Sequence, residues 1–378
     1  MKVRVERDVL SDAVTWTARS LPARPPVPVL AGILLEATED GQFVLSAFDY
    51  EVSARVEVVA DVADPGQALV SGRLLAEISR QLPAQPVELV LEGTRVILTC
   101  GASRFTLGAM PVEDYPTLPA MPPELGTINS GDFAEAVGQV AVAASKDETL
   151  PILTGVRMKV DGEGLALLAT DRYRLGMREL GWRPDTGDVE SAALVRARTL
   201  TEVARTLGAG GDITLALSHT GSGDRIGFSA GGRQVTSLLI DGDYPVDRVQ
   251  ALFPAEAPIH AVVQRAALVE AVKRVSLVAE RNTPVRLSFT ADQLTLDAGQ
   301  ADEAQASEAI PVTLSGEDIT IAFNPHYLLD GLAAVTAEYV RLSFTLPTKP
   351  AVLTGQAEAE GDDDAGYRYL IMPIRMVN

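Results

Sequence analysis

With 378 residues, 47% apolar and 22% charged, the chain is long enough for two or three folded domains and too apolar to be disordered. Its net charge of −19 argues against a protein that grips phosphate backbones over its whole surface, although basic residues gathered on one protected face remain compatible with nucleic-acid binding. The single cysteine, Cys100, excludes a disulfide framework and a cysteine metal cluster, and its surroundings predict a buried strand. We find no export signal and no apolar run of about 18 residues, which predicts a cytoplasmic protein without membrane contact.

Three amphipathic stretches recur along the chain at nearly regular intervals. Their apolar residues follow the i, i+3, i+4, i+7 spacing of a helix with one buried face. Each stretch contains an Ala-Val pair, at Ala13-Val14, Ala136-Val137 and Ala271-Val272, and each is followed by a proline, at Pro28, Pro151 and Pro284. The pairs are offset by 123 and 135 residues and the prolines by 123 and 133, so two markers agree on one period. The sequence therefore predicts three copies of one domain, at residues 1–122, 127–252 and 256–378.

In chain order, the first repeat begins with a strand and a helix, and the segment Pro22–Pro28 ends that helix because proline cannot continue it. The predicted helices are Asp8–Leu21 and Ser71–Leu82, the second with Ser71 as a possible cap and Pro83 as its stop. The predicted strands are Met1–Val5, Gly32–Glu36, Phe43–Ser46, Glu51–Val58, Val87–Leu91, Arg95–Cys100 and Ser103–Leu107.

The second and third repeats follow the same order. Their predicted helices are Gly131–Ser145, Arg196–Leu207, the stretch from Leu268 to Ala279, and Asn324–Ala333, where Pro325 suits the first helical turn. The last strand is predicted at Tyr369–Met376, and proline-rich links lie near Pro116–Gly126 and Phe253–Pro258. Each repeat thus carries two amphipathic helices and roughly seven or eight strands, which predicts an α+β fold with two helices packed on an antiparallel sheet.

The sequence lacks the residue patterns that catalysis or metal binding requires. Its histidines lie far apart, without a carboxylate at metal-ligand spacing; they are His219, His260 and His326. The glycine-rich runs from Gly208 and Gly221 lack the strand–loop–helix setting of a phosphate loop. Asp362–Asp364 sits in a polar stretch typical of a solvated loop. We therefore predict no enzymatic activity, no cofactor and no metal.

Basic residues recur on helices whose other face is apolar. They are Arg73 and Arg80 in the first repeat, Arg196, Arg198 and Arg205 on the equivalent helix of the second, Lys273 and Arg274 in the third, and Arg24 after the first helix. The pairs Arg73/Arg80 and Arg198/Arg205 share a spacing of seven residues, which is two helical turns. Taken singly, each is typical of a solvated helix surface. Their recurrence at equivalent places favours a functional surface.

Several motifs spread over the whole length resemble those of bacterial sliding clamps, the β subunits of DNA polymerase III. They are Lys2–Arg7, Leu21–Pro25, Phe48–Glu51, Val70–Arg73, Thr170–Leu175, Ala322–Pro325 and Met372–Arg375. The sequences of these motifs are most similar to those of actinobacterial clamps, and the arginine-rich composition is consistent with such a source. The resemblance implies a head-to-tail homodimer whose six clamp domains close into a ring. It also implies that this ring is a processivity factor without catalytic activity of its own.

The resemblance also implies which residues face double-stranded DNA. They are Arg24, Arg73, Arg80, Arg196 and Arg198, with Arg205 on the same helix as the last two. A ring that holds DNA topologically needs only a modestly positive lining, which reconciles DNA binding with the acidic composition. No base readout is expected, since base contacts would oppose sliding.

A further implication is a pocket between the second and third domains, where the polymerase III α subunit, the clamp loader and repair proteins dock through a Gln-Leu-x-Leu-Phe-like segment. The matching residues are Leu153, Thr170, Arg172, Tyr173, Arg174, Leu175, Pro245, Asn324, Tyr327, Pro350, Leu370, Ile371, Met372, Pro373, Ile374, Arg375 and Met376. Apolar side chains suit such a cleft, and Arg174 and Asn324 are placed to hold a polar end. Peptide antibiotics that target actinobacterial clamps are additional candidate ligands. Without the resemblance, plain core burial is an alternative for the C-terminal strand, and alternate side chains of one strand can serve both roles.

For the dimer contact, the resemblance sets domain one of one copy against domain three of the next, near Arg104, Leu277, Asp302 and Glu303.

Two differences from other clamps border the expected pocket. The segment Pro245–Pro254 is about two residues longer than in other clamps, and the chain runs past the usual end. One alternative is therefore a specialised second clamp with altered affinity for pocket ligands. A remoter alternative is a carboxylate-dependent hydrolase on a repeated scaffold, for which the sequence offers no titratable cleft.

Overall fold

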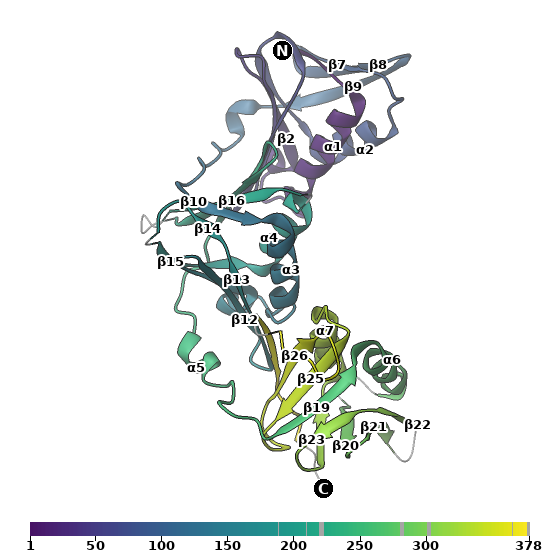
Figure 1. Ribbon diagram of the computed structural model, residues 1–378. Coiled ribbons are helices and arrows are strands. Elements are labelled where there is room, and N and C mark those ends of the chain that lie inside the picture. The colour runs from purple at the N-terminus through teal and green to yellow at the C-terminus, as the bar shows by residue number, and fades with distance from the viewer. Residues whose placement is uncertain are drawn as a thin grey trace. The chain divides into compact units, whose positions relative to one another are not determined.

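The chain forms two compact units in a computed structural model that describes residues 1–187, 189–208, 210–218, 223–279, 283–300, 304–364 and 366–375 (Figure 1). The first unit consists of Met1–Gly131, Arg183–Thr186 and Arg205–Leu239. The second consists of Asp132–Trp182, Gly187–Ala204 and Ile240–Asn378. Each unit therefore combines segments that are far apart in the sequence.

The first unit is built on one antiparallel sheet. Its described strands pair in the order β14-β10-β16-β17-β18-β4-β3-β2-β6-β9-β8-β7-β1-β5. Their bounds are β1 (Lys2–Val5), β2 (Gly32–Ala37), β3 (Phe43–Phe48), β4 (Val52–Val58), β5 (Asp61–Asp64), β6 (Gly66–Ser71), β7 (Val87–Glu92), β8 (Arg95–Cys100), β9 (Ser103–Met110), β10 (Glu124–Asn129), β14 (Arg183–Pro184), β16 (Asp212–Ser218), β17 (Arg225–Ala230) and β18 (Arg233–Leu238). The helices are α1 (Arg7–Thr17), α2 (Gly72–Gln81) and the short 3₁₀ turns η1 (Ala18–Ser20), η2 (Pro28–Ala31) and η3 (Val112–Asp114).

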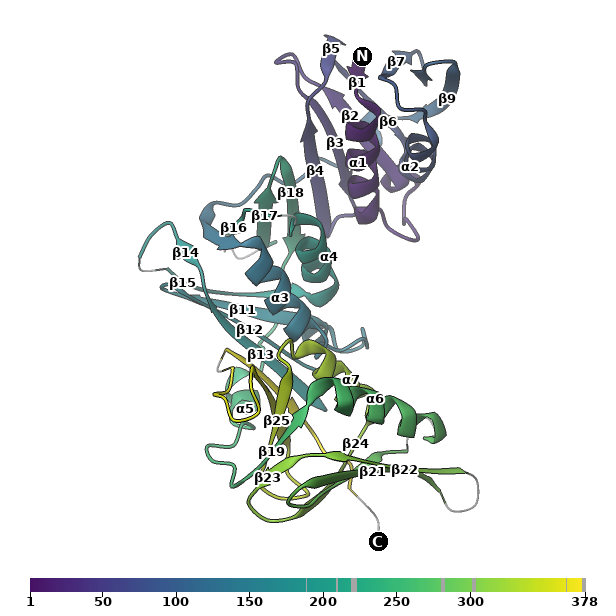
Figure 2. The same ribbon diagram turned by 45° about the vertical axis from the view of Figure 1, so that its right-hand side comes forward.

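Helices α1 and α2 lie side by side against this sheet (Figure 2). α1 packs on β3 and β4, and α2 packs on β2 and β6. Leu10, Ala13 and Val14 of α1 are at most 1% exposed, as the spacing of an amphipathic helix predicts. All six positions of β3 are buried, so this strand lies at the centre of the core.

The second unit contains two antiparallel sheets. Its described strands pair in the orders β15-β11-β12-β13-β27-β26-β25-β19-β23 and β22-β21-β20-β24. Their bounds are β11 (Gly155–Asp161), β12 (Gly164–Thr170), β13 (Arg174–Gly181), β15 (Glu190–Arg196), β19 (Ile259–Gln264), β20 (Val285–Phe289), β21 (Gln293–Gln300), β22 (Ala304–Pro311), β23 (Thr313–Ser315), β24 (Ile319–Phe323), β25 (Tyr339–Phe344), β26 (Ala351–Gln356) and β27 (Tyr367–Ile371). The helices, most of whose residues belong to this unit, are α3 (Ser130–Ala141), α4 (Ala197–Leu207), α5 (Val246–Gln250), α6 (Arg265–Val275), α7 (Pro325–Ala334), η4 (Pro151–Thr154) and η5 (Ser276–Val278).

The sheets continue from one predicted repeat into the next. In the first unit, β4 of repeat one pairs with β18 of repeat two, with Val52 opposite Ser237. In the second unit, β13 of repeat two pairs with β27 of repeat three, with Arg174 opposite Ile371. The repeats therefore share backbone hydrogen bonds, and the α+β architecture with antiparallel sheets is as predicted.

The markers of the predicted repeats occupy equivalent structural positions. The Ala-Val pairs lie on α1, α3 and α6 and are all at most 1% exposed. Pro28 and Pro151 each begin a 3₁₀ turn that leads into a strand, and Pro284 directly precedes β20. Cys100 is 1% exposed at the end of β8, and its thiol donates to the carbonyl oxygens of Pro83 and Gln85, as expected for a buried strand residue.

Several predicted helix details were wrong. α1 ends at Thr17, and the next three residues form a 3₁₀ turn, whereas the prediction extended the helix to Leu21. α3 ends at Ala141 and does not reach Ser145. Ser71 precedes α2 but forms no side-chain capping hydrogen bond. The predicted start of the last helix is confirmed, since the Asn324 side chain accepts a hydrogen bond from the backbone N–H of His326 and Pro325 lies in the first turn.

Gly331 lets α7 approach β27 closely, and this contact can be tested. A Cβ atom at position 331 would overlap the fully buried ring of Tyr369, whose hydroxyl donates to the Tyr327 carbonyl oxygen at 2.8 Å. We expect Gly331→Ala to lower the free energy of unfolding by about 2 kcal/mol, the typical cost of overpacking a core. Urea unfolding followed by circular dichroism measures the change.

Gly138 of α3 is the matched control for this substitution. Apart from neighbouring atoms of its own helix, nothing lies within 4 Å of a Cβ atom built there, so Gly138→Ala should leave stability unchanged or raise it by up to about 1 kcal/mol. Equal losses of stability for both variants would show that the cost arises elsewhere than at the Tyr369 contact.

Candidate functional site

The turn between β12 and β13 has an unusual backbone conformation. Arg172 has a φ of +81°, in the left-handed region that non-glycine residues rarely occupy. The turn is stabilised by Asp171, whose Oδ1 accepts hydrogen bonds from the backbone N–H groups of Tyr173 and Arg174 at 3.0 and 3.1 Å. The Thr170 hydroxyl donates to the Arg174 carbonyl oxygen at 2.6 Å. This network fixes the backbone from which Tyr173 and Arg174 project.

The same turn occurs in the first unit, between β3 and β4. Tyr50 has a φ of +75°, and Asp49 Oδ1 accepts hydrogen bonds from the N–H groups of Glu51 and Val52 at 3.0 and 2.7 Å. The similarity of repeats one and two thus extends to a strained backbone position and to the carboxylate that stabilises it.

Beside the turn at Asp171 lies an apolar cluster that we call the groove cluster. Its buried members are Leu168, Leu175, Met177, Leu194, Tyr244, Val249, Val352 and Leu370. Partly buried side chains pack against it, namely Ile152, Ile240, Val246, Phe253 and Met372. The structure thus brings together Leu175, Leu370 and Met372, which the resemblance had placed in one pocket. The sequence motifs did not identify the other members singly: some are strand residues outside the motifs, and Val246, Val249 and Phe253 belong to the segment Pro245–Pro254, which was expected only to border the pocket.

Arg174 joins this turn to helix α7. Its side chain is only 5% exposed, and its Nε and Nη1 atoms contact Asp171 Oδ2 at 2.9 Å and Asp330 Oδ2 at 2.5 Å. The guanidinium also lies over the Tyr327 ring, 4.5 Å from its centroid. Burial acts to lower the pKa of Arg174, but Tyr369, Asp330 and Asp171 outweigh it and raise the pKa above its usual value. Much of this side chain is therefore engaged within the unit, and its predicted contact with a docked peptide stays a prediction.

The rim beside the groove cluster is aromatic. Tyr173 is 54% exposed, and its ring stacks on the Tyr327 ring, with 6.0 Å between centroids and 21° between planes. The C-terminal segment is fixed against this rim, because Met372 N–H donates to the Tyr173 carbonyl oxygen and Ile374 N–H donates to that of Ala322, each at 2.8 Å.

The remaining predicted pocket residues differ in exposure. Ile371 is buried; Leu153, Pro245, Asn324, Pro350, Pro373 and Ile374 are partly exposed; Arg172 and Arg375 are exposed. Met376 lies outside the described residues.

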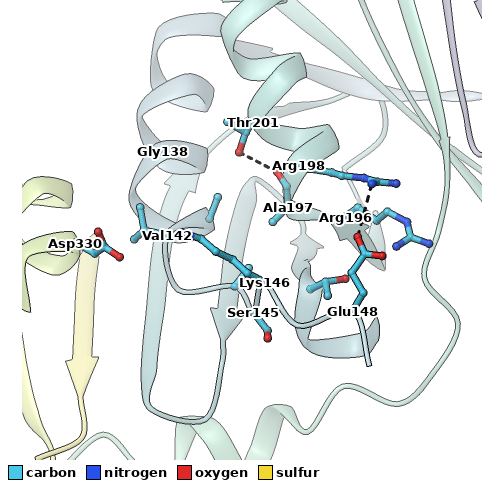
Figure 3. Close-up of a pocket in the computed structure, with 13 residues that line it drawn as sticks. Gly138, Val142, Ser145, Lys146, Glu148, Arg196, Ala197, Arg198, Thr201 and Asp330 are labelled. Carbon is cyan, nitrogen blue, oxygen red and sulfur yellow. Dashed lines mark hydrogen bonds and ion pairs between the residues drawn. The ribbon is translucent and has the colours of Figure 1, made fainter. Parts of the chain in front are cut away.

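A separate cavity of about 520 Å³ lies beside α3 and the start of α4 (Figure 3). Its charged lining residues are Lys146, Glu148, Arg196, Arg198 and Asp330. The basic side chains come from two places in the chain, Lys146 after α3 and Arg196 and Arg198 at the junction of β15 and α4, and they outnumber the two carboxylates by one. Arg198 is 3.8 Å from Glu148, a loose and mostly exposed ion pair. Arg196 and Arg198, two of the predicted DNA-facing arginines, thus line one cavity together with Lys146, which the sequence analysis did not single out.

No group of three or more His, Cys, Asp and Glu side chains is placed to hold a metal ion in the part of the chain that the structure describes. Within the same residues, no helix is long and apolar enough to cross a membrane.

Family models of three consecutive domains match nearly the whole chain. They are those of the DNA polymerase III beta subunit: its N-terminal domain at residues 1–119, its central domain at 127–246 and its C-terminal domain at 250–375. The chain belongs to the DNA polymerase III beta subunit family. Its fold is accordingly that of three α+β clamp domains, and its function is that of a beta sliding clamp.

Individual sliding clamps are similar over most or all of the chain. The beta sliding clamp of Streptomyces coelicolor is 55% identical over 377 residues and covers 100% of both chains. That of Micrococcus luteus is 55% identical over 314 residues, 83% of this chain and 100% of the relative. A crystal structure of the Pseudomonas aeruginosa clamp bound to griselimycin has a TM-score of 0.91, 26% identity and 100% coverage of both chains. These comparisons confirm the resemblance to actinobacterial clamps and support neither the specialised second clamp nor the hydrolase.

The other predicted DNA-facing arginines of this clamp are exposed residues of the first unit. They are Arg24, Arg73, Arg80 and Arg205. The Arg73 side chain donates a hydrogen bond to the carbonyl oxygen of Ala23 at 3.1 Å, which links α2 to the loop that carries Arg24. Arg80 donates to the carbonyl oxygen of Ala76, one turn before it on α2. Their contact with DNA stays a prediction.

The predicted dimer residues are only partly described. Arg104 is exposed on β9, and Leu277 is 84% exposed in η5. Asp302 and Glu303 lie outside the described residues.

The buried guanidinium of Arg174 yields a stability prediction. Removing it leaves the Asp171 carboxylate, whose side chain is 10% exposed, without its charged partner. We expect Arg174→Ala to lower the free energy of unfolding by about 3 kcal/mol, as is typical when one partner of a buried ion pair is deleted. The matched control, Arg172→Ala, changes an exposed residue of the same turn and should cost about 0.5 kcal/mol or less. Similar losses in urea unfolding for both variants would contradict a structural role for the ion pairs.

Proposed function

We propose that two copies of the chain associate head to tail into a ring that encircles duplex DNA and tethers replication proteins to it, without catalytic activity of its own. The observation that carries this proposal is the match of three consecutive clamp domains over nearly the whole chain. We place the domains at residues 1–122, 127–252 and 256–378, so that two copies supply six. The ring would act in the cytoplasm, on the DNA being replicated.

The charge distribution supports sequence-independent contact with DNA. Lys146, Arg196 and Arg198 collect around one cavity in a chain whose net charge is −19. Phosphate contacts by such residues position a protein on a duplex but carry no sequence information. The carboxylates of Glu148 and Asp330 line the same cavity and reduce its net positive charge. Attraction to the phosphates is then weak enough for the protein to slide along DNA.

Two unpaired sheet edges support the proposed dimer. In the described residues, Ser103–Leu107 of β9 pairs only with β8, and β22 pairs only with β21. Such edges present free backbone donors and acceptors that readily pair with another chain. Phe105 on β9 is 37% exposed, and Leu277, which precedes the β20–β22 hairpins, is 84% exposed. We propose that β9 of one copy pairs with β22 of the next and that these side chains become buried there.

Leu277 is the residue with which to test the dimer. Leu277→Asp places a charge in the proposed apolar contact, so the mass measured by light scattering at micromolar concentration should fall from that of a dimer to that of a monomer. The variant should also lose retention on circular DNA after loading. Val59→Asp, at a position that is 91% exposed, should remain dimeric. A monomeric wild-type protein would rule out the closed ring.

The groove cluster and its aromatic rim support peptide docking. Short peptide segments commonly dock where apolar side chains meet a few fixed polar groups, and both kinds of group lie together here. We propose that the polymerase III α subunit, the clamp loader and other proteins carrying a Gln-Leu-x-Leu-Phe-like motif bind here. The griselimycin complex of the Pseudomonas aeruginosa clamp supports a comparable ligand for this family, including antibiotics of that kind.

Met372 provides the peptide test. Its side chain packs against the groove cluster, while its backbone N–H holds the segment to Tyr173, so Met372→Ala removes a contact surface without releasing the segment. We expect a fluorescent Gln-Leu-x-Leu-Phe peptide to bind the wild-type protein saturably and the variant about tenfold more weakly, since burial of several methylene-sized groups is lost. Anisotropy titration measures both affinities. Unchanged binding by Met372→Ala would place the peptide elsewhere, and Val59→Ala serves as the exposed control.

A further inference from the structure

Asp330 on α7 is shared between the two candidate sites. Its Oδ2 atom accepts a hydrogen bond from Arg174 Nη1 at 2.5 Å, beside the groove cluster. Its side chain also lines the basic cavity, where Asp330 lies on one side and Arg196 and Arg198 lie on the other (Figure 3). All four residues belong to the second unit. One carboxylate therefore contacts the guanidinium at the proposed peptide site and lines the proposed DNA surface.

The two carboxylates that hold Arg174 differ in their freedom to move. The Asp171 side chain is 10% exposed, and its Oδ1 atom accepts two backbone N–H groups of its own turn, so this carboxylate is fixed. The Asp330 side chain is 46% exposed, and among the described residues its one ion pair is with Arg174. A half-exposed carboxylate can leave its partner at small cost, because water solvates it once the contact opens. The contact between Arg174 and Asp330 is thus the one that another acceptor can replace.

A docked peptide supplies such an acceptor. Its backbone carries carbonyl oxygens, and the glutamine of a Gln-Leu-x-Leu-Phe segment adds a side-chain amide oxygen. When one of these oxygens takes the Arg174 Nη1 donor, the Asp330 carboxylate loses that contact and remains beside the basic cavity. Because the cavity of about 520 Å³ is on the order of 10 Å across, about one Debye length in 0.1 M salt, this charge acts on an anion bound anywhere within it.

We propose that Asp330 couples the two sites, so that peptide docking weakens the contact of the basic cavity with DNA phosphates and DNA contact weakens peptide docking. This inference rests on the proposed function, because it assigns a regulation to the proposed peptide and DNA sites. Its direction follows from charge: a carboxylate released by Arg174 repels a phosphate, and a phosphate in the cavity drives the carboxylate back onto Arg174. The two effects are equal in size, since coupling between two binding equilibria is reciprocal. A tethered partner thereby loosens the contact of its own clamp with the duplex.

The experiment measures binding of a fluorescent Gln-Leu-x-Leu-Phe peptide to the full-length protein with and without a short linear DNA duplex. In anisotropy titrations, saturating duplex should weaken peptide binding by the wild-type protein about threefold, the effect of one charge acting over several ångströms in partly screened surroundings. Binding of a labelled duplex should weaken by the same factor when saturating unlabelled peptide is present.

Two variants test whether the Asp330 charge carries the effect. Asp330→Asn removes the charge and keeps an oxygen that Arg174 can bind, so neither ligand should change its affinity for the other. Glu148→Gln is the matched control, because Glu148 lines the same cavity but has its ion pair with Arg198. This control should bind the duplex more tightly and retain the threefold effect. Urea unfolding followed by circular dichroism checks that both variants fold.

The outcomes separate the coupling from the proposed function. If the wild-type protein binds peptide and duplex independently, or if each ligand strengthens binding of the other, the coupling is overturned and both sites remain. A threefold effect that persists in Asp330→Asn would also overturn it, because the two ligands would then repel or overlap directly. Wild-type protein that binds no peptide or no duplex would overturn the proposed function and the coupling with it. An effect lost in Asp330→Asn alone supports the coupling.

Discussion

The structure around the proposed peptide site depends on one buried guanidinium. Arg174 leaves the β12–β13 turn, contacts Asp171 within that turn, and reaches Asp330 on α7, more than one hundred and fifty positions away in the chain. A cation at this depth is stable only with charged and aromatic partners, so the turn, α7 and the Tyr327 ring must hold their relative positions. The stacking of Tyr173 on Tyr327 and the anchoring of Met372 to Tyr173 follow from that geometry. Asp330 also lines the basic cavity, so the same carboxylate takes part in both candidate sites.

Local patterns sufficed for the parts of the fold that depend on local physics. The buried Ala-Val pairs of α1, α3 and α6 follow from helical periodicity, and the start of α7 follows from an asparagine cap before proline. Pairing between distant strands does not follow from periodicity, because any exposed edge can accept a neighbour. The junctions of β4 with β18 and of β13 with β27 were therefore not foreseen. For Ser71, in contrast, a local pattern predicted a feature that the structure lacks: serine has good capping propensity, but this side chain makes no capping hydrogen bond.

The candidate sites were predictable to different degrees. Leu175, Leu370 and Met372 belong to recognisable motifs and do meet in space. Leu168, Leu194 and Val352 are ordinary strand residues whose alternation matches that of any core position, so no sequence signal separates them from the rest of the core. α5 was missed because a helix of five residues carries too little periodicity to be predicted. Lys146 reaches the basic cavity from the chain that follows α3, where spacing rules for helices no longer apply.

The position of Cys100 has a practical consequence. It is the chain's single cysteine, 1% exposed and with its thiol directed at two carbonyl oxygens of its own unit. Reagents that alkylate thiols act on accessible thiolates, which burial disfavours. In the folded protein, Cys100 should therefore not react with thiol-directed labels. A cysteine introduced on an exposed position can carry a dye or spin label without first replacing the native residue.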